Sequence, residues 1–350
     1  MDRTNRDCPD CAGEFDLDRR HFLLTAGAAA VLPLGLTPRV EATATPESDA
    51  EKAVKGLFET LTDDQKKVVC FEWDYIEKTG TKRGLLRTHV SNNWQITKPH
   101  IKSDFYTAKQ QEIIHDIFKG IINPDWYKKF LKQLKDDTGG QDWGHDQSIA
   151  VFGTPGKGKF QFVMTGRHMT IRADGGSTES VSFGGPIFYG HAASGFNEKK
   201  GHPGNVFWPQ AVEANKVFGM LEEMKKEKAL VVKRPHESAV EFKGPKGTFT
   251  GFPCAEMNTD QKKELTKVLA MLVEPYRKED RDEALDCLKK QGGLDKCYLT
   301  FYKEGALEDG VYDNWRLEGP SFVWYFRGTP HVHVWVNVAS DPSLKLNARG

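Results

Sequence analysis

The sequence predicts an α+β fold in which a mainly antiparallel β-sheet packs with helices. Residues 148–189 contain short segments rich in β-branched and aromatic residues, separated by glycine-containing turns, which is typical of an antiparallel meander. Residues 297–338 contain four further segments of the same kind. The stretches before and between these two regions carry apolar residues at helical spacing. Runs of strands and runs of helices together indicate the α+β class.

The composition is that of an ordinary soluble globular protein. The 350 residues have a formal net charge of zero, and 38% are hydrophobic and 28% charged. Because there is no basic excess, we expect no nucleic-acid partner. No internal repeat, low-complexity segment or clear linker is visible. We therefore expect one α+β domain over residues 45–343 and a flexible tail over residues 344–350.

Residues 1–44 have the pattern of an export signal. The segment Asp18-Arg19-Arg20-His21-Phe22-Leu23 resembles a twin-arginine signature, and the uncharged run 22–36 follows it. This run is too short for a comfortable permanent span, and Ala42-Thr43-Ala44 fits a cleavage site. We expect export by the twin-arginine machinery to the periplasm or the extracellular space, with no stable membrane span after processing. An uncleaved anchor is the alternative.

The cysteines fall into two groups. Cys8 and Cys11 form a lone CxxC pair ahead of the arginines and would leave with the signal. The four others are Cys70, Cys254, Cys287 and Cys297. An oxidising destination permits disulfides, and Cys287–Cys297 is the first pair to test. Buried free thiols are the alternative.

Capping patterns mark several helix starts, such as Thr62 with Gln65 and Asn258 with Gln261. The expected helices cover residues 50–61, a short segment opening at 62–65, and residues 107–119, 123–140, 208–228, 258–276 and 280–291. The expected strands cover residues 85–96, 148–152, 159–165, 168–172, 181–189, 297–302, 312–317, 322–326 and 331–338.

Three common catalytic patterns are not supported. The loop Gly153–Lys159 nearly matches a P-loop, but Phe160 stands where a Mg²⁺-binding Ser or Thr belongs, and a strand follows. We interpret this loop as a hairpin turn. The sequence contains no Gly-x-Ser-x-Gly elbow and no His-Glu-x-x-His pattern. Export also argues against a reactive free thiol at Cys254.

Two histidines near the C-terminus share one face of a predicted strand. Side chains alternate along a strand, so His331 and His333 point the same way. Two imidazoles at this spacing can bind one metal ion. The alternative is that they are ordinary strand residues, as most His-x-His pairs are.

Several stretches occur together in a recognisable order. They are Val151-Phe152-Gly153-Thr154-Pro155, Gly166-Arg167-His168-Met169-Thr170, Gly185-Pro186-Ile187-Phe188-Tyr189-Gly190, Gly319-Pro320-Ser321-Phe322, and His331-Val332-His333 with Trp335. Together they resemble the domain of unknown function 3500 family, an uncharacterised bacterial family often found with export signals. The resemblance covers about residues 50–340 and implies no established reaction.

The chain departs from the family pattern at two places. The family usually has two adjacent histidines where this chain has Arg167-His168. It also usually has a longer turn before its histidine pair, and an Arg-Asp after the tryptophan, where this chain has Val336-Asn337. If the missing groups are catalytic, we expect this chain to differ in activity.

His168, His331 and His333 are the candidate metal ligands, and the matched positions of the resemblance include all three. Imidazole nitrogens suit copper, zinc and iron, and three of them leave a coordination position for water or substrate. Export and the lack of a nearby carboxylate pattern favour copper or zinc over iron.

Four other residues are candidates for a role in metal binding, substrate binding or catalysis. His191 and His202 flank a Gly/Ser/Asn-rich loop and are possible additional ligands or proton shuttles, although exposed loop histidines explain them as well. Arg167 is a candidate for holding an anionic substrate, or for pairing with a surface carboxylate. Glu318 is a candidate general base, but no partner carboxylate for a glycosidase is evident.

Three functions remain open. The first is an exported copper- or zinc-dependent oxidoreductase or hydrolase that acts on a small molecule. The second is a non-catalytic envelope protein that binds a metal or another ligand. The third is an interaction protein in which the histidines bind no metal.

Overall fold

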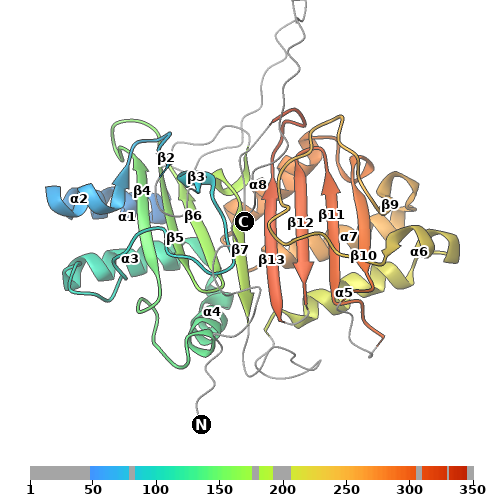
Figure 1. Ribbon diagram of the computed structural model, residues 1–350, viewed down its shortest axis with the longest axis horizontal. Coiled ribbons are helices and arrows are strands. Elements are labelled where there is room, and N and C mark those ends of the chain that lie inside the picture. The colour runs from blue at the N-terminus through green and yellow to red at the C-terminus, as the bar shows by residue number, and fades with distance from the viewer. Residues whose placement is uncertain are drawn as a thin grey trace, which may run out of the picture.

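The computed structural model describes residues 48–78, 83–175, 181–191, 206–304, 310–328 and 331–344. The predicted export signal, Cys8, Cys11, His202 and the tail beyond residue 344 lie outside these residues. The fold is α+β, as expected, with a large and mostly antiparallel sheet (Figure 1).

Helices form where apolar residues recur at helical spacing, and capping boxes at Thr62, Thr107 and Asn258 start three of them. The helices are α1 (Asp49–Thr60), α2 (Asp63–Val69), α3 (Ala108–Ile121), α4 (Pro124–Asp137), α5 (Trp208–Gly219), α6 (Glu223–Ala229), α7 (Thr259–Val273) and α8 (Lys278–Lys290). No helix in the described ranges has the length and apolar character needed to cross a membrane.

Eleven strands form one sheet in the order β1-β4-β5-β6-β7-β13-β12-β11-β10-β8, with β9 paired to β10. Most neighbours are antiparallel; β1–β4 and β8–β10 are parallel. The strands are β1 (Cys70–Phe71), β4 (Ser148–Gly153), β5 (Phe160–Gly166), β6 (Met169–Asp174), β7 (Ile187–His191), β8 (Leu230–Val231), β9 (Phe252–Pro253), β10 (Tyr298–Tyr302), β11 (Asn314–Gly319), β12 (Phe322–Arg327) and β13 (Val332–Val338). A separate hairpin pairs β2 (Ile76–Glu77) with β3 (Gly84–Leu85).

The pairing of β7 with β13 joins the two predicted strand regions into this one sheet. Val334 lies opposite Tyr189 and Trp335 opposite Phe188 in the antiparallel register. The expected meander is confirmed, because β4 to β7 follow one another as antiparallel neighbours. The Gly153–Lys159 loop is the turn of the β4–β5 hairpin, as predicted.

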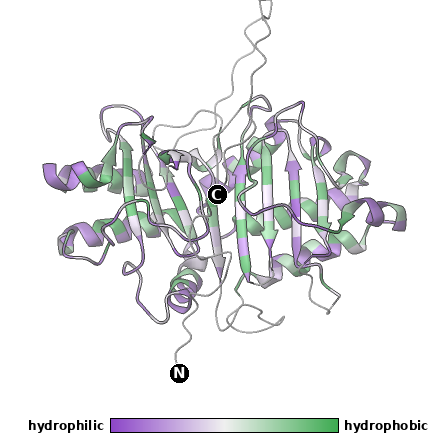
Figure 2. Ribbon diagram, viewed as in Figure 1, coloured by the Kyte–Doolittle hydropathy of each residue, from purple (hydrophilic) through white to green (hydrophobic). Residues whose placement is uncertain are grey.

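The two faces of the sheet are covered differently. Helices pack on one face, and residues such as Phe162 and Val334 belong to the main hydrophobic core between them. Irregular chain around residues 86–107 and 232–251 crosses the other face, in front of the sheet in Figure 1. In Figure 2, hydrophobic and hydrophilic residues are interspersed along both the helices and the strands.

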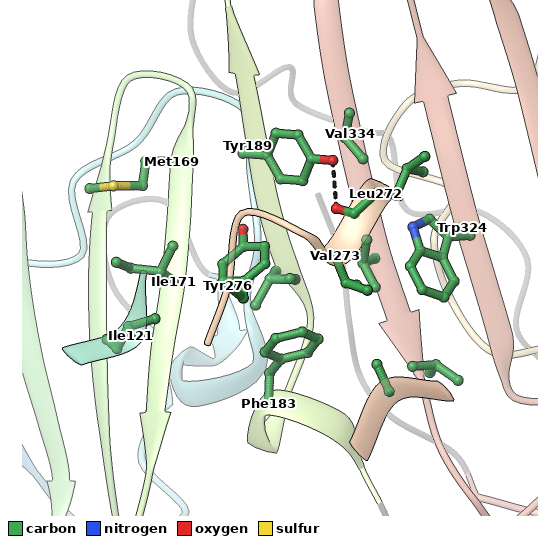
Figure 3. Packing of buried hydrophobic residues seen from close by; sticks show 14 of the residues in the cluster. Ile121, Met169, Ile171, Phe183, Tyr189, Leu272, Val273, Tyr276, Trp324 and Val334 are labelled. Carbon is green, nitrogen blue, oxygen red and sulfur yellow. Dashed lines mark hydrogen bonds between the residues drawn. The ribbon is translucent and has the colours of Figure 1, made fainter. Parts of the chain in front are cut away.

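Tyr189 ties the sheet to helix α7. Its hydroxyl donates a hydrogen bond to the carbonyl of Leu272 at 2.7 Å, next to Tyr276 and Val334 (Figure 3). Burial raises the pKa of the Tyr189 hydroxyl well above its ordinary value. Trp315 and Trp324 are also fully buried. These aromatic side chains belong to the main hydrophobic core.

Residues 85–96 do not form the predicted strand; that prediction was wrong. Beyond β3 the chain makes a 3₁₀ turn, Leu86–Thr88, and then runs irregularly. Several of its polar backbone groups bond to side chains instead of a strand ladder. Arg172 donates to the carbonyls of Arg87 and His89, and Thr165 accepts from the N–H of Ile96 at 2.9 Å.

The single helix expected over residues 208–228 is two helices, α5 and α6. The break follows Gly219, and the carbonyl of Met220 accepts a hydrogen bond from the Gln261 side chain at 2.7 Å. A side chain from a distant helix thus caps the end of α5, which local sequence cannot indicate. Similarly, the strand expected at 181–189 begins only at Ile187, after a 3₁₀ turn at Ser182–Gly184.

Candidate metal centre

The three candidate histidines meet where strands β7 and β13, in the middle of the sheet, lie next to the β5–β6 turn. His333 lies in β13, opposite Gly190 of β7 and Arg327 of β12. His331 immediately precedes β13 and lies on the same face by alternation. His168 lies in the turn between β5 and β6, and its carbonyl accepts a hydrogen bond from the N–H of Gly190 at 3.1 Å.

The backbone around His168 is unusually constrained. Its φ is 55°, a left-handed conformation that is uncommon for residues other than glycine. Its N–H donates to the carbonyl of Asn92 at 2.9 Å. Beside it, a Cβ at Gly190 would lie 2.5 Å from the Val332 carbonyl oxygen and 3.2 Å from the ring of His333. The missing side chain of Gly190 therefore lets the strands and the imidazoles approach.

The imidazole rings form a compact, buried cluster. The ring centroids of His168 lie 4.9 Å from His331 and 5.0 Å from His333, and the last two are 4.6 Å apart. One nitrogen from each ring lies within 4.8 Å of the others. His168 and His333 have no exposed surface and His331 has 3%. Among the described residues this is the group of His, Cys, Asp or Glu side chains with the geometry for a metal.

Asp137, the last residue of α4, orients His168. Its Oδ2 lies 2.9 Å from Nδ1 of His168 and accepts a hydrogen bond from Gln133 at 2.9 Å. Burial by itself would raise the pKa of Asp137, but His168 and Gln133 hold it below its ordinary value. The carboxylate is therefore ionised and favours the imidazole proton on Nδ1, so that Nε2 of His168 carries the lone pair that a metal would bind.

Glu237 does the same for His333. Its Oε2 lies 2.8 Å from Nδ1 of His333. Arg327 donates from Nη2 to Nε2 of His333 at 3.1 Å and from Nη1 to Oε1 of Glu237. Because a guanidinium group only donates, Nε2 of His333 is the acceptor and Nδ1 carries the proton. Two carboxylates thus fix two imidazoles in the tautomer that ligates a metal through Nε2.

All three imidazoles are neutral at pH 7. Burial lowers the pKa of His168, although Asp137 offsets part of this effect. Burial lowers the pKa of His333 well below its ordinary value, and Arg327 lowers it further. Burial also lowers the pKa of His331, with His333 and His168 adding to the effect. Neutral imidazole is the form that binds metal ions.

His331 closes the cluster. Its Nε2 lies 3.1 Å from Nε2 of His168. Because Nε2 of His168 is an acceptor, His331 donates this hydrogen bond. With a metal between the rings, His331 would carry its proton on Nδ1 and offer Nε2 as the third ligand.

Of the other candidate residues, His191 and Arg167 lie near the histidine cluster. His191 is buried beside the centre, with Nδ1 3.7 Å from Oδ1 of Asp137, but it does not belong to the three-histidine group. Arg167 is nearly buried, its N–H donates to Asp146 at 2.9 Å, and its charge lowers the pKa of His331. His202 lies outside the described residues.

Glu318 lies apart from the histidines. It is paired with Arg316 and Lys243, each at 2.9 Å. In the register it is opposite Val323, which is opposite Asn337, four residues or about 13 Å along β13 from His333. The structure does not bring this carboxylate to the metal centre.

Sequence reasoning missed the residues that orient the histidines. Asp137 had a signal, because it follows Phe130 and Leu134 at helical spacing and so lies on the buried face of α4. A carboxylate at a helix C-terminus is also unfavourable unless something pairs with it. Glu237 follows a strand by only a few residues in irregular chain, and no local pattern distinguishes it. Arg327 became recognisable only with the β12–β13 register.

The comparisons with known proteins agree with the resemblance. A family model described as "Protein of unknown function (DUF3500)" matches residues 43–339, which include the three histidines and both carboxylates. No curated protein and no solved structure matches the chain. Since the family model covers most of its length, the chain belongs to the DUF3500 family of proteins of unknown function.

Proposed function

We propose that the protein is an exported metal-binding protein in which His168, His331 and His333 hold one copper or zinc ion. The observation that carries this proposal is the pair of carboxylate–histidine contacts, Asp137 to His168 and Glu237 to His333, at 2.9 and 2.8 Å. Such contacts recur behind metal-ligating histidines, where they set the tautomer and the ring orientation.

The packing of the three rings suits a shared ligand. Nε2 of His168 and Nε2 of His331 lie 3.1 Å apart, and a ring nitrogen of His333 belongs to the same cluster. A metal ion satisfies three lone pairs at once. Three imidazole ligands suit copper or zinc and leave one position for a small molecule or water.

The catalytic form of this function is oxidative or hydrolytic chemistry on a small molecule at that open position. A bound zinc ion would polarise an oxygen or lower the pKa of a bound water, and copper would supply redox chemistry. Export by the twin-arginine route to the periplasm or outside remains part of the proposal, supported by the pattern around Arg19 and Arg20.

A second function, metal binding without catalysis, is favoured by the burial of the centre. None of the three imidazoles exposes more than 3% of its surface. A protein that only stores or carries a metal needs no access for a substrate. Turnover across a broad panel of small molecules separates the two functions, since a binding protein takes up metal without any reaction.

Elemental analysis of the full chain purified from its own compartment tests the proposal. We expect about one copper or zinc per chain, and loss of the metal in the His331→Ala/His333→Ala double variant. His145→Ala, which removes an exposed histidine, is the matched control and keeps the metal. Metal-free protein whose unfolding is unchanged by added copper or zinc would contradict the proposal.

A further inference from the structure

Charged side chains crowd the candidate centre more than a three-histidine site requires. Arg327 is fully buried against His333 and Glu237. Arg234 lies 3.5 Å from Glu237. Arg167 is the neighbour of His168 in the chain and is 8% exposed.

Without a metal the centre is close to electrical balance. Against the carboxylates of Asp137 and Glu237 stand two guanidinium groups: Arg327 pairs with Glu237, and the charge of Arg167 lowers the pKa of all three imidazoles. Arg234 is shared between Glu237 and the more exposed Glu304. The three histidines are neutral. A divalent ion would therefore add about two positive charges to a buried site.

The resident carboxylates are not placed to neutralise those charges by direct ligation. Each accepts the Nδ1 proton of an imidazole, so each lies on the outer side of a ligand. The balancing anion must come from outside the chain, at the open position of the metal.

The contact between Arg327 and His333 shows where that anion would lie. Nη2 of Arg327 lies 3.1 Å from Nε2 of His333, the atom that would bind the metal at about 2 Å. When the metal takes the lone pair of Nε2, this N–H loses its acceptor and lies beside a like charge. Because Nη1 stays bound to Glu237, the group cannot move far. A metal-bound oxygen with negative charge restores the hydrogen bond and removes the repulsion.

We propose that the open position of the metal takes a small oxyanion, such as a carboxylate or phosphate group, held between the metal and Arg327, with Arg167 as the second cation. The ligand is small because the centre is buried. The inference rests on the proposed function, since without the metal the site has no surplus charge.

The test uses the full chain loaded with one equivalent of Cu(II). Azide is the reporter, because its charge-transfer absorption appears only when it binds the copper, and acetate and inorganic phosphate compete with it. We expect one or both oxyanions to displace azide. In Arg167→Gln the copper content is unchanged, but the competing oxyanion binds at least tenfold more weakly.

Two further variants complete the design. Arg327→Lys keeps a charge beside Glu237 but loses the fork that joins it to His333, and is expected to bind copper and to weaken oxyanion binding. Arg281→Gln, on α8, is the arginine control and changes neither the copper content nor the oxyanion affinity. If the copper loads and neither oxyanion competes, or if Arg167→Gln and Arg327→Lys bind as tightly as the wild type, the oxyanion site is refuted while the metal centre stands. If copper does not load, both proposals fail.

Discussion

The carboxylate of Glu237 lies 2.8 Å from Nδ1 of His333, although the two residues are 96 positions apart in the chain. The same arrangement, Asp137 with His168, lies on the other side of the cluster. Two carboxylates from unrelated segments, one from a helix end and one from irregular chain, thus converge on ring nitrogens that do not face the cluster. A single such contact is common in proteins, whereas a pair around three buried imidazoles supports the metal centre proposed above.

Asp137→Asn and Glu237→Gln are each expected to weaken metal binding 10- to 100-fold while leaving the three histidines in place. The amide can orient the ring less firmly and carries no negative charge to support the ligand. Competition with a metal-chelating dye measures the affinity. Asp136→Asn, the neighbour that pairs with Lys132 at the surface, is the control and keeps the wild-type affinity. Equal affinities in all four proteins would contradict the carboxylate roles.

Gly190→Ala is expected to destabilise the protein and to lower its metal content together. The new methyl group would meet the Val332 carbonyl at 2.5 Å and the rings of His168 and His333 at 3.2 Å. Since backbone cannot yield, β7 and β13 must separate, at a cost of about 1–3 kcal/mol. Urea unfolding and elemental analysis check both effects. Gly219→Ala, where nothing lies within 4 Å of the added carbon, is the matched control.

The free energy of unfolding is expected to fall in acid, in part because His89 is buried in its neutral form. Burial, with Arg83 and Arg172 nearby, lowers the pKa of His89 to about 3. Between that value and the unfolded value near 6.5, only the unfolded chain binds the proton, so stability falls as the pH falls through this window. At pH 4.5 the loss from this one group is about 2–3 kcal/mol.

His89→Phe tests this directly, because phenylalanine keeps the edge contact with Trp94 and cannot titrate. The drop in the free energy of unfolding between pH 7 and pH 4.5 should be smaller in the variant than in the wild type. Identical drops would show that His89 does not contribute. His145→Phe, an exposed position, supplies the comparison.

The buried thiols are expected to react slowly with alkylating reagents in the folded protein. Burial raises the pKa of Cys254 and of Cys287 to about 12 and that of Cys70 to about 11. Little thiolate is present at pH 8, and the reagent cannot reach Cys297. In the structure all four are free thiols. Mass spectrometry after labelling in buffer and in urea counts the reactive cysteines. The Cys287–Cys297 disulfide considered from the sequence is not formed in the structure, and the alternative of free thiols holds. All four cysteines are therefore expected to be labelled in urea, and an unlabelled Cys287 and Cys297 would contradict this.

Local sequence patterns predicted the parts of this fold that depend on local rules. Capping boxes such as Asn258 with Gln261 marked helix starts, and the alternation on β13 put His331 and His333 together. The patterns failed where distant side chains replace backbone partners. Arg172 holds the carbonyls that would have belonged to a strand at 85–96, and Gln261 ends α5. The three histidines were within reach of the sequence; Glu237 and Arg327 were not, because only strand register and a long crossing segment place them.

The left-handed backbone at His168 has a consequence for chemical rescue. A glycine is the one residue that adopts a φ of 55° without strain, so His168→Gly removes the imidazole while relaxing the backbone. Free imidazole added to this variant should enter the space beside Asp137 and restore metal binding. His168→Ala, which retains the backbone strain and fills part of the space, should be less stable and harder to rescue. A ligand that can be supplied from solution would turn this constrained turn into an adjustable coordination site.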